Sequence, residues 1–109
     1  MSKVQATVNP GICGFATKVT ADCEDGQTAA VSLETECPSL APMAEKLGEV
    51  DAFAACFGKI ADSAVYQIAN DYCAHTACPV PCAVVKAVEA AAGLALPADV
   101  SIAIEKLEG

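Results

Sequence analysis

The sequence predicts an α+β fold, with a four-stranded, mostly antiparallel sheet in the order β-β-β-helices-β and the helices on one face of the sheet. Apolar and polar residues alternate in three segments of the first third of the chain, which is the period of half-buried strands. Beyond Cys37-Pro38 the apolar residues recur with helical spacing, and alternation returns at residues 100–105. The 109 residues suffice for one core, so residues 1–109 are expected to form a single domain of two layers.

The first three strands are expected at residues 3–8, 14–23 and 29–37. Asn9-Pro10-Gly11 marks a turn between the first two strands. Asp25-Gly26 is a strong hairpin signal between the second and the third. Because the apolar residues occupy every second position, one face of this sheet should be covered by the helices.

Four helices are expected to follow, at about residues 42–47, 51–57, 63–72 and 79–92. Pro42 and Pro79 suit the first position of a helix, because proline lacks the amide hydrogen that would be unpaired there. Ser63 is the expected N-cap of the third helix, and Gly93 ends the fourth. The alternating residues 100–105 then complete the sheet as its last strand.

The composition limits the class of partner. The formal net charge of −8 argues against nucleic acid and against anionic membrane surfaces, which both attract basic proteins, and suits a partner protein with a basic patch. Hydrophobic residues make up 54% of the chain, which favours a homo-oligomer. The sequence has no signal-peptide pattern and no apolar run of membrane-spanning length. We therefore expect a cytoplasmic protein whose seven cysteines stay reduced and serve metal ligation, catalysis or core packing.

The hairpin allows two distant cysteines to be placed. With a turn centred on Asp25-Gly26, Cys13 is expected opposite Cys37 within one residue, at the open end of the hairpin and on the face that the helices cover. Cys23 points to the same face but lies ten residues further along its strand, roughly 30 Å away. Cys23 is therefore expected to fill the core, as is Cys56 on its helix.

The stretch from Cys73 to Cys82 contains three cysteines and the only histidine, His75. Cys78 is expected at or near the N-cap of the last helix, where free amides and the helix dipole favour a thiolate. If this helix end docks over the open end of the hairpin, Cys13, Cys37 and Cys78 converge as ligands. Cys82, Cys73 or His75 would supply the fourth ligand.

An iron–sulfur cluster of the [4Fe-4S] type is the first hypothesis for this site. Its ligands come from scattered cysteines, and the Cys37-Pro38 and Cys78-Pro79 steps match the Cys-Pro step that closes bacterial ferredoxin motifs. Gly11 and Gly14 flank Cys13 and let the backbone approach closely. The function would be electron transfer or cluster carriage with a redox partner protein. The sequence leaves an enzymatic activity open but leans against it, because no paired carboxylates are placed for acid–base catalysis.

Three alternatives remain. A zinc or other metal module is one, although paired C-x2-4-C knuckles are absent. A thiol-redox protein is the second, with Cys78 as nucleophile, Cys82 as resolving thiol and His75 as base. The third is an interaction module whose cysteines all fill the core.

Several stretches carry a resemblance: residues 9–15 (NPGICGF), Cys37, residues 75–81 (HTACPVP) and residues 92–97 (AGLALP). They resemble a family of small, functionally uncharacterised proteins from anaerobic bacteria and archaea, over nearly the whole chain. The resemblance implies that Cys13, Cys37, His75 and Cys78 are recurring positions, whereas the other four cysteines are particular to this sequence: Cys23, Cys56, Cys73 and Cys82. An anaerobic setting would suit an oxygen-sensitive cluster, but the resemblance implies no established activity.

Overall fold

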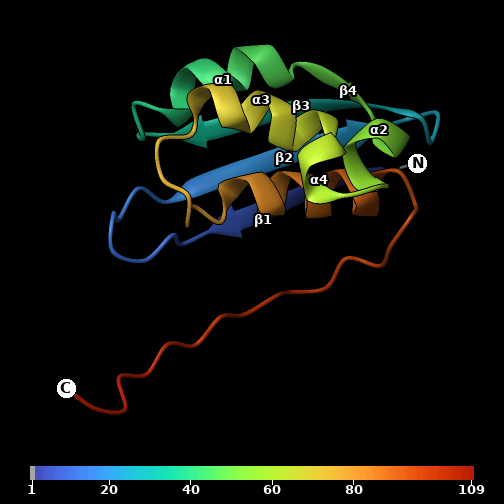
Figure 1. Ribbon diagram of the computed structural model, residues 1–109. Coiled ribbons are helices and arrows are strands. Elements are labelled where there is room, and N and C mark those ends of the chain that lie inside the picture. The colour runs from blue at the N-terminus through green and yellow to red at the C-terminus, as the bar shows by residue number, and fades with distance from the viewer. Residues whose placement is uncertain (1) are drawn as a thin grey trace.

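The computed structural model describes residues 2–109 and has the predicted α+β class, with an antiparallel sheet in the order β1-β2-β3-β4 (Figure 1). The strands are β1 (Ser2–Val8), β2 (Thr17–Cys23), β3 (Thr28–Thr35) and β4 (Glu49–Asp51). The helices are α1 (Leu40–Leu47), α2 (Ala52–Cys56), the short 3-10 helix η1 (Ile60–Asp62), α3 (Ala64–Tyr72) and α4 (Val80–Ala91). No helix within the described residues is long and apolar enough to cross a lipid bilayer.

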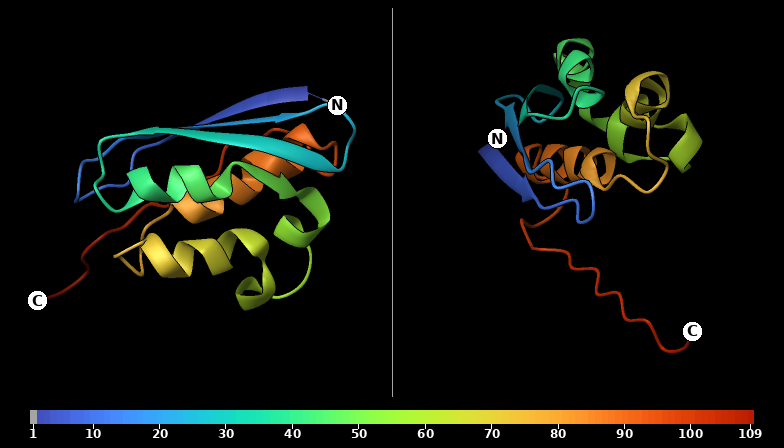
Figure 2. Two further views of the ribbon diagram at one scale, coloured as in Figure 1. Left: turned by 90° about the horizontal axis from the view of Figure 1, so that it is seen from above. Right: turned by 90° about the vertical axis from the view of Figure 1, so that its left-hand side faces the viewer.

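The helices lie on one face of the sheet, as predicted, but they form two layers instead of one (Figure 2). Helix α4 packs on β1 and β2, and α1 packs on β3. Helices α2 and α3 pack mainly against α1 and α4 and therefore lie further from the sheet. The core between sheet and helices is aliphatic, with fully buried Val19, Met43, Leu47, Val84 and Val88. The expectation of two layers is wrong because α1 and α4 already fill the width of the sheet.

Alternation along the strands is confirmed. In β2, Thr17, Val19, Ala21 and Cys23 are buried, while Lys18 between them is exposed. In β3, Ala29 and Val31 are buried and Ser32 and Glu34 are exposed. The outer face of the sheet is therefore polar, and the inner face joins the core.

The hairpin register differs from the predicted one. Strands β2 and β3 pair Cys23 with Ala29 and Thr17 with Thr35. The reason lies in the turn, where the Asp25 carboxylate accepts hydrogen bonds from the amides of Gln27 (2.9 Å) and Thr28 (2.8 Å). These bonds hold open a longer loop than the two-residue turn that Asp-Gly favours. Continuing this register would place Cys37 opposite Phe15 and not opposite Cys13, and the pairing ends before either position is reached.

The fourth strand is not the predicted one. It is Glu49–Asp51, which pairs with β3 so that Val50 faces Ala29. Gly48, with a φ of 32°, ends α1 and turns the chain back towards β3, where its carbonyl accepts the amide of Val31 at 2.7 Å. A strand of three residues is too short to show alternation in the sequence. The predicted strand at residues 100–105 has no regular structure and lies outside the sheet.

Helix boundaries lie close to the predicted ones, but the side chain of Ser63 does not make the predicted capping hydrogen bond. Asp51 caps α2, its carboxylate accepting the amide of Ala54 at 2.9 Å. Ser63, the predicted cap of α3, is buried and instead donates its hydroxyl to the Ala55 carbonyl at 2.6 Å. Its hydroxyl therefore ties α3 to α2 and does not cap its own helix.

Candidate functional site

Three loops meet at one end of the sheet, on the left in Figure 1. They are residues 9–16 between β1 and β2, residues 36–39 between β3 and α1, and residues 73–79 between α3 and α4. Together they line a pocket of about 240 Å³. Five of the predicted site residues line this pocket: Cys13, Cys37, Cys73, His75 and Cys78.

The first loop turns tightly around Cys13. The Asn9 side-chain carbonyl accepts the amide of Gly11 at 3.3 Å, and the amide of Gly14 donates to the Gly11 carbonyl at 3.0 Å. Gly11 and Gly14 have φ values of 90° and 72°, which glycine adopts without strain. The loop holds Cys13 half-buried, with Phe15 also lining the pocket.

The second loop holds Cys37 through a threonine pair at the end of the hairpin. The hydroxyls of Thr17 and Thr35 lie 2.8 Å apart, and the Thr35 hydroxyl also accepts the amide of Cys37 at 3.1 Å. The Cys37 carbonyl accepts the amides of Leu40 and Ala41 from the start of α1. Cys37 is thus fixed on both sides. This threonine pair was not predicted from the sequence, although two threonines at the open end of a hairpin indicate such a pair.

The third loop brings two further thiols near each other. Cys73 follows α3, and its amide donates to the Ala69 carbonyl at 2.7 Å. The carbonyl of His75 accepts both the Cys73 thiol at 3.4 Å and the amide of Cys78 at 3.1 Å. The Cys73 thiol is also near enough to the Cys78 thiol to raise its pKa. The imidazole of His75 lines the pocket from an exposed position.

Cys78 lies near the N-cap of α4, as predicted, whereas Pro79 occupies the cap and not the first helical position. Pro79 is the N-cap and α4 begins at Val80, so Cys78 precedes the cap. Burial raises the pKa of the Cys78 thiol to about 11; the Val80 amide lowers it, and the nearby Cys73 and Cys37 raise it further. The thiol is therefore protonated near neutral pH in this geometry. This finding weighs against an activated thiolate at the helix N-terminus.

Cys82 does not line the pocket. It is exposed on the first turn of α4 and contacts Tyr66 of α3, where burial and then Cys82 raise the pKa of the Tyr66 hydroxyl. Cys78 precedes the helix, so Cys78 and Cys82 do not share a helix face. The four thiols that line one pocket are those of Cys13, Cys37, Cys73 and Cys78.

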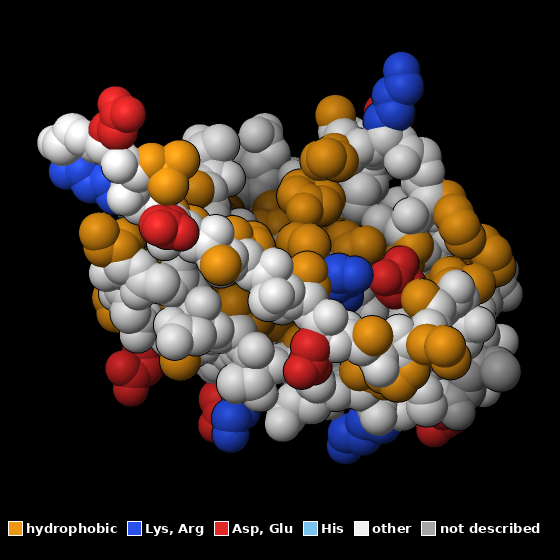
Figure 3. Space-filling view, turned by 90° about the horizontal axis from the view of Figure 1, so that it is seen from below, with side chains coloured by type: hydrophobic (Ala, Val, Ile, Leu, Met, Phe, Trp, Pro, Cys, Tyr) orange, Lys and Arg blue, Asp and Glu red, His pale blue; other side chains and the backbone are white. Residues whose placement is uncertain are grey.

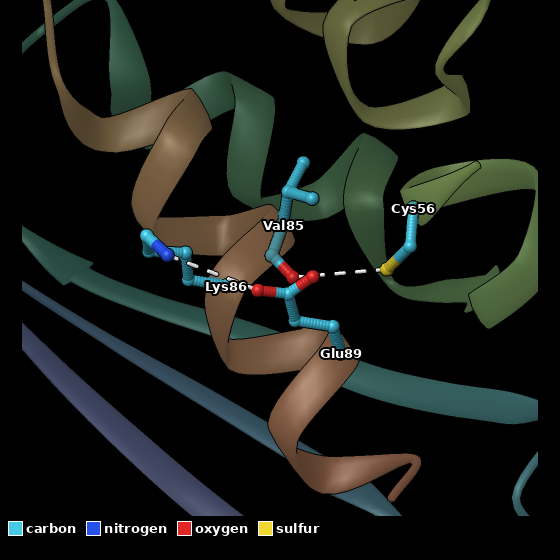
Figure 4. Close-up of polar contacts among 4 residues, drawn as sticks. All are labelled: Cys56, Val85, Lys86 and Glu89. Atoms are coloured by element: carbon cyan, nitrogen blue, oxygen red, sulfur yellow. Dashed lines mark hydrogen bonds and ion pairs between the residues drawn. The ribbon is translucent and has the colours of Figure 1, made fainter. Parts of the chain in front are cut away.

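The other two cysteines belong to the packed interior, as expected. Cys23 is only 1% exposed, in the core beneath the sheet. Cys56 is half-buried against α4, and its thiol donates to the Val85 carbonyl at 3.8 Å (Figure 4). Burial and the neighbouring Glu89 raise the pKa of Cys56 to about 11. The same figure shows Glu89 turned to Lys86, at 3.9 Å.

The pocket thiols surround a space and do not meet at a point. Among residues 2–109, no group of three or more Cys, His, Asp or Glu side chains is arranged to hold a single metal ion. The described residues contain no disulfide bond. The arrangement can therefore offer sulfur ligands to a group with the dimensions of the pocket, or bring the Cys73 and Cys78 thiols together as a redox pair.

A family model matches residues 4–104, which include every residue of the pocket and the whole sheet apart from the first positions of β1. The chain belongs to DUF6951, a family of unknown function. This agrees with the predicted resemblance to an uncharacterised family over nearly the whole chain. No curated protein and no solved structure matches the chain. The membership brings no activity with it.

Proposed function

We propose that this DUF6951 protein binds an iron–sulfur cluster of the [4Fe-4S] type in the pocket at the end of the sheet and serves in electron transfer or cluster carriage. The observation that carries the proposal is the lining of one pocket by Cys13, Cys37, Cys73 and Cys78. These cysteines come from three loops that are distant in the sequence. Four cysteine thiolates are the usual ligand set of such a cluster.

The size of the pocket favours a cluster over one zinc ion. A volume of 240 Å³ corresponds to about eight water molecules at about 30 Å³ each. Zinc needs ligand sulfurs at about 2.3 Å around one point. The described residues offer no such point, whereas a cluster holds its ligands apart around its own volume.

The proposed ligand set replaces Cys82 by Cys73. Cys73 lines the pocket and interacts with Cys78, whereas Cys82 is exposed and does not line the pocket. His75 also lines the pocket and is the alternative fourth ligand. The three cysteines Cys13, Cys37 and Cys78 belong to both sets.

The pocket walls supply the environment that such a group needs. Phe15, Leu40 and Val80 line the pocket beside the thiols and limit the access of water. The amide of Val80 points to the Cys78 sulfur and would stabilise its thiolate form. A bound cluster would supply one-electron redox chemistry. The protein would hold it, shield it and present it to a partner.

The net charge of −8 favours a redox partner with a basic docking patch, because complementary charges accelerate encounter. Cysteines without disulfide bonds among the described residues suit a reducing compartment such as the cytoplasm, and an anaerobic host would spare the cluster from oxygen. These assignments belong to the same proposal.

A dithiol function is the second candidate, because the Cys73 and Cys78 thiols line the same pocket and lie near enough for Cys73 to shift the pKa of Cys78. The two thiols would form a disulfide, losing two protons and passing two electrons to a disulfide of the partner, which is reduced to two thiols. The raised pKa of Cys78 slows this chemistry at neutral pH.

Anaerobic purification of the full chain, with iron, sulfide and zinc measured per chain, tests the proposal. We expect about four iron and four sulfide, with the loss of both when Cys13, Cys37 or Cys78 is replaced by serine. Cys82→Ser and Cys56→Ser are matched controls that should keep the cluster. Cys73→Ser and His75→Ala decide the fourth ligand.

A chain without iron and sulfide after anaerobic reconstitution would refute the cluster. Zinc without sulfide would establish the single-metal alternative. A metal-free chain in which Cys73 and Cys78 form a disulfide with each other, while a disulfide of the redox partner is reduced, would establish the dithiol function.

A further inference from the structure

The C-terminal segment carries exposed apolar side chains at alternate positions. Val100, Ile102 and Ile104 are 62%, 78% and 93% exposed, and the residues between them are smaller or polar: Ser101, Ala103 and Glu105. This is the period of a strand with one apolar face. In the structure the segment runs away from the body of the molecule in two perpendicular views (Figures 1 and 2). A segment with the sequence pattern of a strand is therefore exposed to solvent and pairs with no strand of the sheet.

The segment is part of the family's domain. The family model extends through residue 104 and so includes all three of these apolar residues. A position in a sheet is the environment that such a pattern fits.

Strand β1 offers the complementary edge. It pairs with β2 on one side and forms the end of the sheet on the other. The edge is seven residues long, contains no proline, and has Lys3 as its one charge. Natural edge strands usually carry stronger protection against pairing than this. The other edge strand, β4, has only three residues.

The side chains of β1 show what a neighbouring strand would cover. Val4 and Ala6 point towards the helices but are only half-buried, because no strand among the described residues flanks them at the sheet edge. A strand beside β1 would place its apolar face next to these residues and along the flank of α4, which packs on β1 and β2. Its polar face would join Lys3 on the outer surface, where Glu105 supplies the opposite charge.

We propose that two copies of the chain form a dimer by exchanging their C-terminal segments, with residues 99–105 of each copy added as a fifth strand to the β1 edge of the other. Sheet extension by an incoming strand gains main-chain hydrogen bonds and buries alternate side chains. Reciprocal exchange between identical chains closes the assembly at two copies. This assembly is independent of what the pocket binds.

The direction of the chain favours the second copy over the chain's own edge. Helix α4 ends near the start of β1, so a segment folding back on its own β1 would run parallel to it (Figure 1). Parallel pairing is slightly weaker per residue than antiparallel pairing, which a second copy can adopt. At about 3.3 Å per residue, residues 94–109 extend about 50 Å, which is enough to reach a neighbouring molecule. Figure 3 shows the side of the molecule on which the segment lies, with apolar side chains spread between a few charged ones.

Light scattering after size-exclusion chromatography, over a range of concentrations of the full chain, tests the dimer. We expect a mass of twice 11.0 kDa. The double variant Ile102→Asp, Ile104→Asp should weaken the dimer by about tenfold or more, because two buried aliphatic side chains are replaced by charges. The double variant Ser101→Asp, Ala103→Asp adds the same charge on the polar face and should weaken it far less. All four positions lie outside the core, and circular dichroism checks that both variants fold.

Hydrogen exchange gives a second readout. The amides of residues 100–105 should be protected in the dimer and exchange freely in the Ile102→Asp, Ile104→Asp variant. A wild-type monomer at every concentration would overturn the proposal, and protection of these amides in such a monomer would assign the segment to its own β1. Equal weakening by both double variants would overturn it as well.

Discussion

Replacing Thr35 by valine should both destabilise the protein and release Cys37. The Thr35 hydroxyl lies 2.8 Å from the Thr17 hydroxyl and accepts the Cys37 amide at 3.1 Å. Valine keeps the shape of the side chain but removes both hydrogen bonds. Each such bond contributes about 0.5–1.5 kcal/mol to stability, so the expected loss is about 1–3 kcal/mol. The Thr17 hydroxyl keeps the Phe15 carbonyl as a partner at 3.1 Å, which places the expected value near the middle of that range, about 2 kcal/mol.

Urea unfolding of the metal-free protein measures this loss as a shift in the midpoint at constant slope. Thr20→Val is the matched control, because it makes the same change on the outer face of β2. The same pair of variants, purified anaerobically, should differ in iron content, since only Thr35 holds the amide of a proposed ligand. If Thr35→Val and Thr20→Val lower the free energy of unfolding by amounts within about 0.3 kcal/mol of each other, the threonine pair does not stabilise this end of the hairpin.

Further changes give equally direct tests. Met43→Ala, at a fully buried position, should cost about 2–5 kcal/mol in the free energy of unfolding, whereas Lys46→Ala on the exposed side of the same helix should cost far less. Gly14→Ala should lower the free energy of unfolding by about 1–2 kcal/mol, because a φ of 72° is unfavourable for alanine even though the added Cβ would meet no other atom. A smaller decrease would mean that the loop changes its backbone conformation. The pKa values of Cys56 and Cys78 are raised from 9.0 to about 11, so the unfolded chain loses these two protons at a lower pH than the folded chain. The two thiols should therefore contribute fully to the free energy of unfolding of the metal-free protein below pH 9, and this contribution should be lost as the pH rises towards 11. Cys56→Ala should make this fall in stability shallower in urea titrations across that pH range, and an unchanged slope would contradict the burial of its thiol. In alkylation followed by peptide mass spectrometry, exposed Cys82 should react well before buried Cys23.

The sequence was enough to predict that three of the cysteines lie at the same end of the molecule. The Asp25-Gly26 turn required a hairpin, and a hairpin brings the residues before its first strand and after its second to the same end. The proline after Cys78 likewise required a helix to begin nearby. These local rules sufficed to group Cys13, Cys37 and Cys78, which all line the pocket.

The fourth pocket thiol was not predictable in this way. Whether Cys73 or Cys82 reaches the pocket depends on where α4 begins and on how the His75 carbonyl folds the preceding loop. A shift of one residue at a helix start turns a side chain by about 100°, which exceeds what cap signals resolve. The hairpin register was missed for a related reason, because the Asp25 carboxylate selects a longer turn.

The sequence alone determined the α+β class, the first three strands and the order of the helices, because hydrophobic period and turn residues are local properties of the chain. The tertiary structure decided which segment became the fourth strand, how the helices stack and which thiols line the pocket. These outcomes depend on competition between distant segments for the same surface. Glu49–Asp51 is held against β3 by the chain reversal at Gly48, whereas residues 100–105, with the stronger strand pattern, are left without a neighbour in their own chain.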